Sequence, residues 1–186
     1  MKKSMKSAMK AAAMMLMATV MTVGMASCVN DDDDNSTHGA TKKITGAETT
    51  ITITPSTDSK EIAETILEYT DESGRTQTQT AMGSLLTARV KVSKLPANID
   101  ITVKQVSLSG AYIVRDQYNL GAQVKTSTTG YNGGLPSSHT VSQQAFSLKN
   151  YTRNEVPEFF KKTHIIKKTL TIQTTGDGTN FTAKLI

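Results

Sequence analysis

The sequence predicts an all-β fold, a single antiparallel β-sandwich over residues 42–186. Three observations predict it. This part of the chain is rich in Thr, which favours strands. Its apolar residues alternate with polar ones, which is the period of a strand with one buried face. About eight such segments follow one another, each separated from the next by a turn sequence, and this spacing is typical of a two-sheet sandwich.

Alternation of period two places the first strands. Ile and Thr alternate over residues 50–54, and four apolar residues alternate with polar ones over residues 86–92. Residues 94–98, which contain Pro and Asn, form a turn, and residues 99–103 resume the alternation. After Gln105 the apolar positions move by one residue, to Val106 and Leu108. We therefore expect a β-bulge there.

Later segments repeat the pattern, and the sequence Thr175–Gly178 predicts a hairpin turn between the last two. The further strands that the pattern predicts are residues 111–118, 120–126, 141–148, 165–174 and 180–186. Residues 154–162, with Pro157 near their start, predict one short helical turn. Immunoglobulin-like and transthyretin-like strand orders both fit this succession of strands.

One segment has two interpretations. Asp58–Glu61 is a possible helix start, followed by apolar residues on one helical face. The same segment, up to residue 69, fits a strand that pairs through a turn with residues 75–80. We favour the hairpin. Residues 75–80 contain no apolar residue, so we expect a strand at the edge of a sheet with both faces wet.

The first 27 residues have the composition of a secretory signal peptide. Residues 1–10 are positively charged, residues 11–23 are uncharged, and small residues follow up to Cys28. The uncharged run is shorter than the ~20 residues that cross a bilayer as a helix. Without this segment the chain would carry 17 basic and 16 acidic side chains, and not the 21 and 16 of the whole sequence. This near-neutral balance argues against nucleic acid as a partner.

Met25–Cys28 resembles a bacterial lipobox, and the following residues resemble the acidic export tag of surface lipoproteins of the Bacteroidetes group. The resemblance implies that Cys28 becomes the acylated first residue of the mature protein. It also implies an export tag at Asp31, Asp32, Asp33 and Asp34, and a lipid-anchored location in the outer membrane, facing the cell exterior. Residues 28–41 are expected to form a disordered tether, because they contain too few apolar residues to offset the entropy of ordering.

We find no set of residues that predicts an enzyme. The chain has one Cys and three His, so neither a multi-thiolate site nor a zinc site has a ligand set. No catalytic residue, metal site or cofactor is therefore predicted.

Two groups of residues are candidates for binding. A glycine-rich segment, residues 129–138, is expected to form a loop at one end of the sandwich, where it is either a ligand loop or a plain connector. Its candidate ligand residues, with the His that follows it, are Tyr131, Asn132 and His139. A second candidate is an anion-binding patch made by Lys161, Lys162, Lys167 and Lys168, although we favour the simpler interpretation in which their stems lie over neighbouring apolar residues.

Residues 86–92 and 101–111 are weakly similar to a segment of fimbrillin-type pilus subunits, which are lipoproteins that polymerise by strand exchange. This resemblance implies a non-enzymatic binding, assembly or adhesion role, with a protein partner bound by strand addition at an open sheet edge such as residues 76–80. The alternative is a glycan-binding surface lipoprotein of a polysaccharide-uptake system. The chain has no Trp, the residue that most often stacks on sugars, which weakens this alternative.

Replacement of Cys28 by Ala tests the predicted anchor. Several acyl chains bind a membrane almost irreversibly, since each buried methylene contributes ~0.8 kcal/mol. We expect the Cys28→Ala protein to leave the detergent-soluble membrane fraction, while a Ser27→Ala control stays in it. Fractionation followed by immunoblotting measures this, and an unchanged membrane fraction would contradict the anchor.

Overall fold

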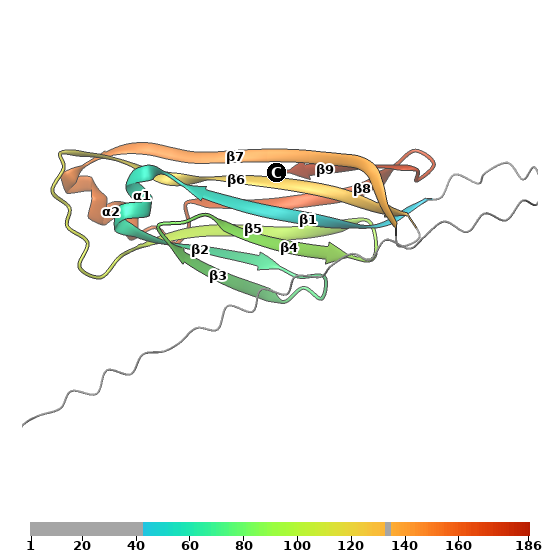
Figure 1. The fold of residues 1–186 in the computed structure, drawn as a ribbon, viewed down its shortest axis with the longest axis horizontal. Helices are drawn as coiled ribbons and strands as arrows, with labels where there is room; N and C mark the ends of the chain where they lie inside the picture. The colour runs from blue at the N-terminus through green and yellow to red at the C-terminus, as the bar shows by residue number, and fades with distance from the viewer. Residues whose placement is uncertain (1–42, 133–134) are drawn as a thin grey trace, which may run out of the picture. The chain divides into compact units, whose positions relative to one another are not determined.

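A computed structural model of the chain describes residues 43–132 and 135–186. The predicted leader, Cys28 and the acidic run Asp31–Asp34 lie outside the described residues. From Ile44 onward the chain forms strands with three short helical segments among them (Figure 1).

The elements follow one another closely along the described residues. In the first half of the domain they are β1 (Ile44–Pro55), α1 (Thr57–Ile62), β2 (Ala63–Thr70), β3 (Thr76–Met82), β4 (Leu86–Val92) and β5 (Ala97–Ser107). In the second half they are β6 (Gln117–Asn132), β7 (Leu135–Thr152), the 3-10 helix η1 (Arg153–Glu155), α2 (Val156–Phe160), β8 (Ile166–Thr175) and β9 (Asn180–Leu185).

The strands form two antiparallel sheets that pack face to face (Figure 1). One sheet has four strands in the order β4-β1-β6-β7, and the other has five in the order β3-β2-β5-β8-β9. The predicted all-β sandwich is therefore confirmed. In an immunoglobulin sandwich the first two strands are neighbours in one sheet. Here β1 and β2 lie in different sheets, so the strand order is not the immunoglobulin one.

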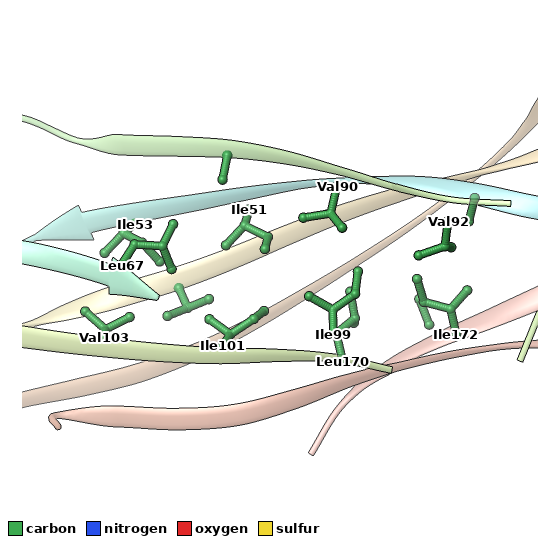
Figure 2. Packing of buried hydrophobic residues seen from close by; sticks show 14 of the residues in the cluster. Ile51, Ile53, Leu67, Val90, Val92, Ile99, Ile101, Val103, Leu170 and Ile172 are labelled. Atoms are coloured by element: carbon green, nitrogen blue, oxygen red, sulfur yellow. The ribbon is translucent and has the colours of Figure 1, made fainter. Parts of the chain in front are cut away.

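The core lies between the sheets and consists of their inward-facing rows. Figure 2 shows Ile51 and Ile53 of β1 on one side and Ile101 and Val103 of β5 on the other, and all four are fully buried. Burial also alternates strictly along β4, as the sequence predicts. Each buried side chain of this size contributes about 1.5–3 kcal/mol. The paired rows therefore hold the two sheets together.

Residues 58–69, for which the sequence allows either a helix or a strand, contain both. The Ser56 hydroxyl caps α1 by accepting a hydrogen bond from the Ser59 amide at 3.2 Å. The helix ends at Ile62, and the chain continues directly as β2, which pairs with β3. β3 is the outermost strand of its sheet and has no buried residue. The favoured hairpin and its wet edge are thus confirmed from Ala63 onward, whereas residues 57–62 form the helix of the alternative interpretation.

The C-terminal hairpin and the short helical turn are also confirmed. β8 and β9 are joined at the turn that the sequence predicts, where the Gly178 amide donates to the Thr175 carbonyl at 3.0 Å. Residues 153–160 form η1 and α2. Val156 and Phe159 of α2 are buried in a second apolar cluster with Tyr118 and Tyr151.

The predicted strand at residues 111–118 is wrong, because residues 108–116 form a loop. Tyr118 holds this loop: its hydroxyl accepts hydrogen bonds from the amides of Val114 and Arg115 at 2.8 and 3.0 Å. The Arg115 guanidinium lies over the Tyr118 ring and pairs with carboxylates of α1. Alternating residues of this loop pack against the second cluster, which produces a strand-like pattern without a strand partner.

Two other strands are longer than the sequence predicts. Residues 120–126 are part of β6, which has 16 residues, and residues 141–148 are part of β7, which has 18. In β6, Thr126 and Thr128 occupy inward positions and are completely buried. The alternation of apolar with polar residues therefore ends before the strand does. Thr128 shares a hydrogen bond of 2.9 Å with buried Thr49 across the sheet.

The bulge predicted after Gln105 is also wrong, because β5 keeps its alternation. Gln105 is buried, with 1% of its surface exposed, and Val106 points outward. The Gln105 amide nitrogen donates to the Thr65 hydroxyl at 3.1 Å and to the Gly121 carbonyl at 3.3 Å. Its amide oxygen accepts from the Ser59 hydroxyl at 3.0 Å, and that hydroxyl accepts from the Gly121 amide at 2.9 Å. A polar side chain can take a core position when its polar groups are satisfied in this way.

Gly121 is a glycine for a steric reason. It has φ of +130°, and a Cβ atom built on it would lie 1.7 Å from the Ser147 carbonyl oxygen of β7. Any other side chain would therefore push β7 away from β6. The close approach lets Gly121 serve both the β6–β7 pairing and the hydrogen bonds to Gln105 and Ser59.

The buried hydrogen bonds of Gln105 can be tested by Gln105→Leu. This change removes the donor to the Thr65 hydroxyl and the acceptor of the Ser59 hydroxyl, while the Gly121 carbonyl keeps its hydrogen bond from the Ser56 amide. We therefore expect the free energy of unfolding to fall by about 1–3 kcal/mol. The control is Gln173→Leu at an exposed position of β8, which should change it by less than about 0.5 kcal/mol. Urea unfolding followed by circular dichroism measures both. Equal stability of the two variants would contradict the role of Gln105.

Candidate functional site

The glycine-rich segment does not form the expected ten-residue loop. Residues up to Asn132 belong to β6, and β7 begins at Leu135, with Asn132 paired to Leu135 and Tyr131 to Pro136. The prediction of a loop is wrong because the sequence around Asn132 favours a short hairpin connection between two long strands. Gly133 and Gly134 lie outside the described residues.

The candidate ligand residues of this segment do not converge on one place. The Tyr131 hydroxyl donates to the Glu48 carboxylate of β1 at 3.0 Å, and burial together with this hydrogen bond raises the pKa of Tyr131. His139 is exposed on β7 and makes an edge-on ring contact with Phe181 of the other sheet, with 5.4 Å between ring centres. Asn132 pairs with Leu135 at the end of the hairpin.

The four lysines of the candidate anion patch do not form one patch. Lys161 pairs with Glu158 within α2 and its C-terminal turn. The Lys162 ammonium donates to the Tyr151 hydroxyl at 2.8 Å and lies over its ring. Lys167 and Lys168 are consecutive residues of β8, so their side chains point to opposite faces of the sheet.

The most elaborate polar structure is the turn Asp71–Arg75 between β2 and β3. The Asp71 carboxylate accepts hydrogen bonds from Ser73, from Arg75 and from the Gln77 amide, at 2.6 to 3.2 Å. The hydrogen bond from the Ser73 hydroxyl, with the others, holds the pKa of Asp71 far below its ordinary value. Glu72 accepts from the Ser93 amide and hydroxyl, which ties the turn to the segment after β4. The turn is therefore fixed to both sheets.

Three cavities surround this turn. The first, of about 650 Å³, is lined by Tyr69, Asp71, Glu72, Ser73, Arg75, Gln77, Arg89, Val90 and Lys91, which come from β2, β3, β4 and the turn. The second, of about 450 Å³, lies on the side of the β4–β5 connection and includes Lys94 and Asn98. The third, of about 260 Å³, lies beside Glu68 and Lys167. The first is within the size range of small-molecule sites. Sequence reasoning did not predict this cavity, because the residues that line it come from separate strands.

The second prominent feature is the free edge of β7. β7 ends the four-stranded sheet, and among the described residues no strand pairs with its outer edge. From Ser137 to Leu148 it carries no Lys, Arg, Asp, Glu or Pro. Phe146 and Leu148, two residues apart and on the same face, are 59% and 48% exposed. Sequence reasoning identified a strand here but missed the edge, although the long uncharged segment was the available indication.

The described residues contain no group of three or more His, Cys, Asp or Glu that could hold a metal ion. No helix among them is long and apolar enough to cross a membrane. The described residues thus provide a polar cavity rich in hydrogen-bond donors and an unpaired strand edge. Both features suit binding.

Compared with known proteins, the chain matches no family model, no curated protein and no solved structure. The class that the described residues define is an all-β sandwich of two antiparallel sheets.

The low pKa of Asp71 predicts a pH-dependent stability. A carboxyl whose pKa is lower in the folded state stabilises that state above its unfolded pKa of about 3.9, and this contribution is lost as the pH falls. We expect wild type to be more stable than Asp71→Asn at neutral pH, and the difference to shrink between about pH 5 and pH 3.

The matched control is Asp116→Asn, since the Asp116 side chain is exposed and forms no hydrogen bond among the described residues. Urea unfolding over this pH range measures the differences. An Asp71→Asn curve that runs parallel to wild type at every pH would contradict the assignment.

Proposed function

We propose that this chain is a lipid-anchored cell-surface protein of the Bacteroidetes type with a non-enzymatic assembly role, and that β7 binds a strand of a second copy. The anchor rests on the lipobox resemblance around Cys28 and on the acidic run after it. The assembly role rests on one observation above others, the long, uncharged and unpaired edge of β7.

An open edge presents unpaired backbone N–H and C=O groups, and monomeric proteins usually protect such edges with charges, prolines or short strands. The other edge strands among the described residues are short: β3 and β4 have seven residues each and β9 has six. β4 and β9 also carry Lys or Arg. β7 has 18 residues and no charge from Ser137 to Leu148. This favours β7 over β3 as the edge that takes a partner strand.

The exposed face beside this edge supplies apolar contacts. Phe146 lies opposite Gln123, and Leu148 lies opposite Gly121, which has no side chain to cover it. A strand added to β7 would place its own side chains next to Phe146 and Leu148, where cross-strand pairs contribute about 0.2–1 kcal/mol each. Backbone hydrogen bonds give such an interface its affinity and the apolar pair gives it a register. A second copy is the partner because of the similarity to pilus subunits that exchange strands.

Glycan binding at the cell surface is the second candidate function. It is favoured by the first cavity, which combines Tyr69 with the donors of Arg75, Arg89 and Lys91.

Phe146→Lys tests the assembly role. It removes an apolar contact and places a charge beside the edge, so we expect self-association of the Cys28→Ala chain to weaken about tenfold, or ~1.4 kcal/mol. Thr78→Lys, at an exposed position of the other uncharged edge, is the control and should leave association unchanged. Sedimentation velocity measures the association. The proposal fails if the chain is monomeric at all concentrations or if both variants behave alike.

A further inference from the structure

The first cavity lies between the edge strands of the two sheets, where β3 and β4 meet beside the Asp71–Arg75 turn. Its lining combines apolar and polar groups. Tyr69 and Val90 belong to the inward rows of β2 and β4 and supply apolar surface. The lining also includes Arg75 of the turn and two cationic residues of β4, Arg89 and Lys91, which alternate with Val90 along the strand.

The two carboxylates of this cavity are already occupied. Asp71 accepts four hydrogen bonds from Ser73 and Arg75 of its own turn and a fifth from Gln77 of β3, and Glu72 accepts two from Ser93. The amide nitrogen of Gln77 is one of the donors to Asp71. These groups build the wall of the cavity, and both carboxylates already accept hydrogen bonds from internal donors.

The cations, in contrast, are largely available. Arg89 and Lys91 form no ion pair within the described residues, and they are two residues apart on the outer face of β4, about 6.4–6.8 Å along the strand. Lys91 lies over the Tyr131 ring at 5.2 Å, and its register partner Glu48 accepts a hydrogen bond from Tyr131. Arg75 gives only its Nε to Asp71, and its side chain is 77% exposed. Arg89 and the terminal nitrogens of Arg75 are therefore cationic donors without an internal partner among the described residues.

We propose that this cavity binds an acidic saccharide, a short oligosaccharide with carboxylated sugar units. The inference rests on the second candidate function and names its ligand class. A sugar ring has an apolar C–H face, which suits the Tyr69 ring, and hydroxyl groups at its rim. A carboxylate on the ring suits the guanidinium of Arg89, which can bind it through two parallel hydrogen bonds, and the ammonium of Lys91 beside it. A cavity of about 650 Å³ is large enough for such a ligand.

An acidic peptide is the competing occupant. The observations favour the saccharide because the turn forms one wall of the cavity and because the apolar surface is confined to Tyr69 and Val90. An extended peptide would need a long open edge, which β7 has and the seven-residue strands β3 and β4 do not.

The test is a calorimetric titration of the Cys28→Ala chain with trigalacturonate, with its methyl ester and with a glutamate trimer. We expect trigalacturonate to bind at least about tenfold more tightly than the fully methylated ester, which has the same sugar backbone and no charge. The double variant Arg89→Gln/Lys91→Gln should lose at least about tenfold in affinity. The control Lys125→Gln/Lys184→Gln removes the same charge from outer positions that do not line the cavity and should bind like wild type.

Each other outcome overturns the inference. Equal binding of the ester would leave glycan binding standing and remove the acidic specificity. Equal binding of the glutamate trimer would show that the cavity takes any anion. Equal affinity of the two double variants would place the ligand elsewhere, and the absence of binding to either saccharide would remove the second candidate function together with this inference.

Discussion

The hydrogen bonds of Gln105 are the interaction on which the arrangement of the sandwich depends. They join β5 and β2 of one sheet to α1 and to β6 of the other sheet through Thr65, Ser59 and Gly121. Hydrophobic burial alone would tolerate small displacements between the sheets, because apolar contacts have little directionality. Directed hydrogen bonds in a dry interior fix the position at which the sheets meet.

The position at which these hydrogen bonds hold the two sheets together also determines the structure at the edges of the molecule. α1 takes the chain from the four-stranded to the five-stranded sheet, and its Ser59 accepts a hydrogen bond from Gly121, a residue of β6 that pairs with β7. Gly121 permits the close approach of β7 at the same place. β7 pairs with β6 along nearly its whole length as the last strand of the sheet, and it is uncharged from Ser137 to Leu148. On the opposite side, β3 and β4 leave a cavity whose walls are held by Asp71 and Glu72.

The sequence predicts correctly those parts of the fold in which the buried residues are apolar and the exposed residues are polar. The inward row of β4, the edge character of β3 and the C-terminal hairpin follow from residue type and turn sequences alone. The prediction went wrong where a polar residue occupies the core, as Gln105 and Thr126 do, because periodicity treats such residues as exposed. It also went wrong for residues 111–118, whose alternation comes from packing around Tyr118. The cavity and the free edge depend on which strands become neighbours, and local sequence does not carry that information.

The central claim is that the edge of β7 is free in the monomer and pairs with a strand of another copy. Hydrogen–deuterium exchange of the Cys28→Ala chain, measured in dilute and in concentrated solution, tests it most directly, because backbone pairing protects amides from exchange. We expect residues 137–148 to gain protection on concentration while β3 and β4 stay unchanged. Exchange in β7 that is the same at both concentrations, or protection that appears in β3 instead, would contradict the claim.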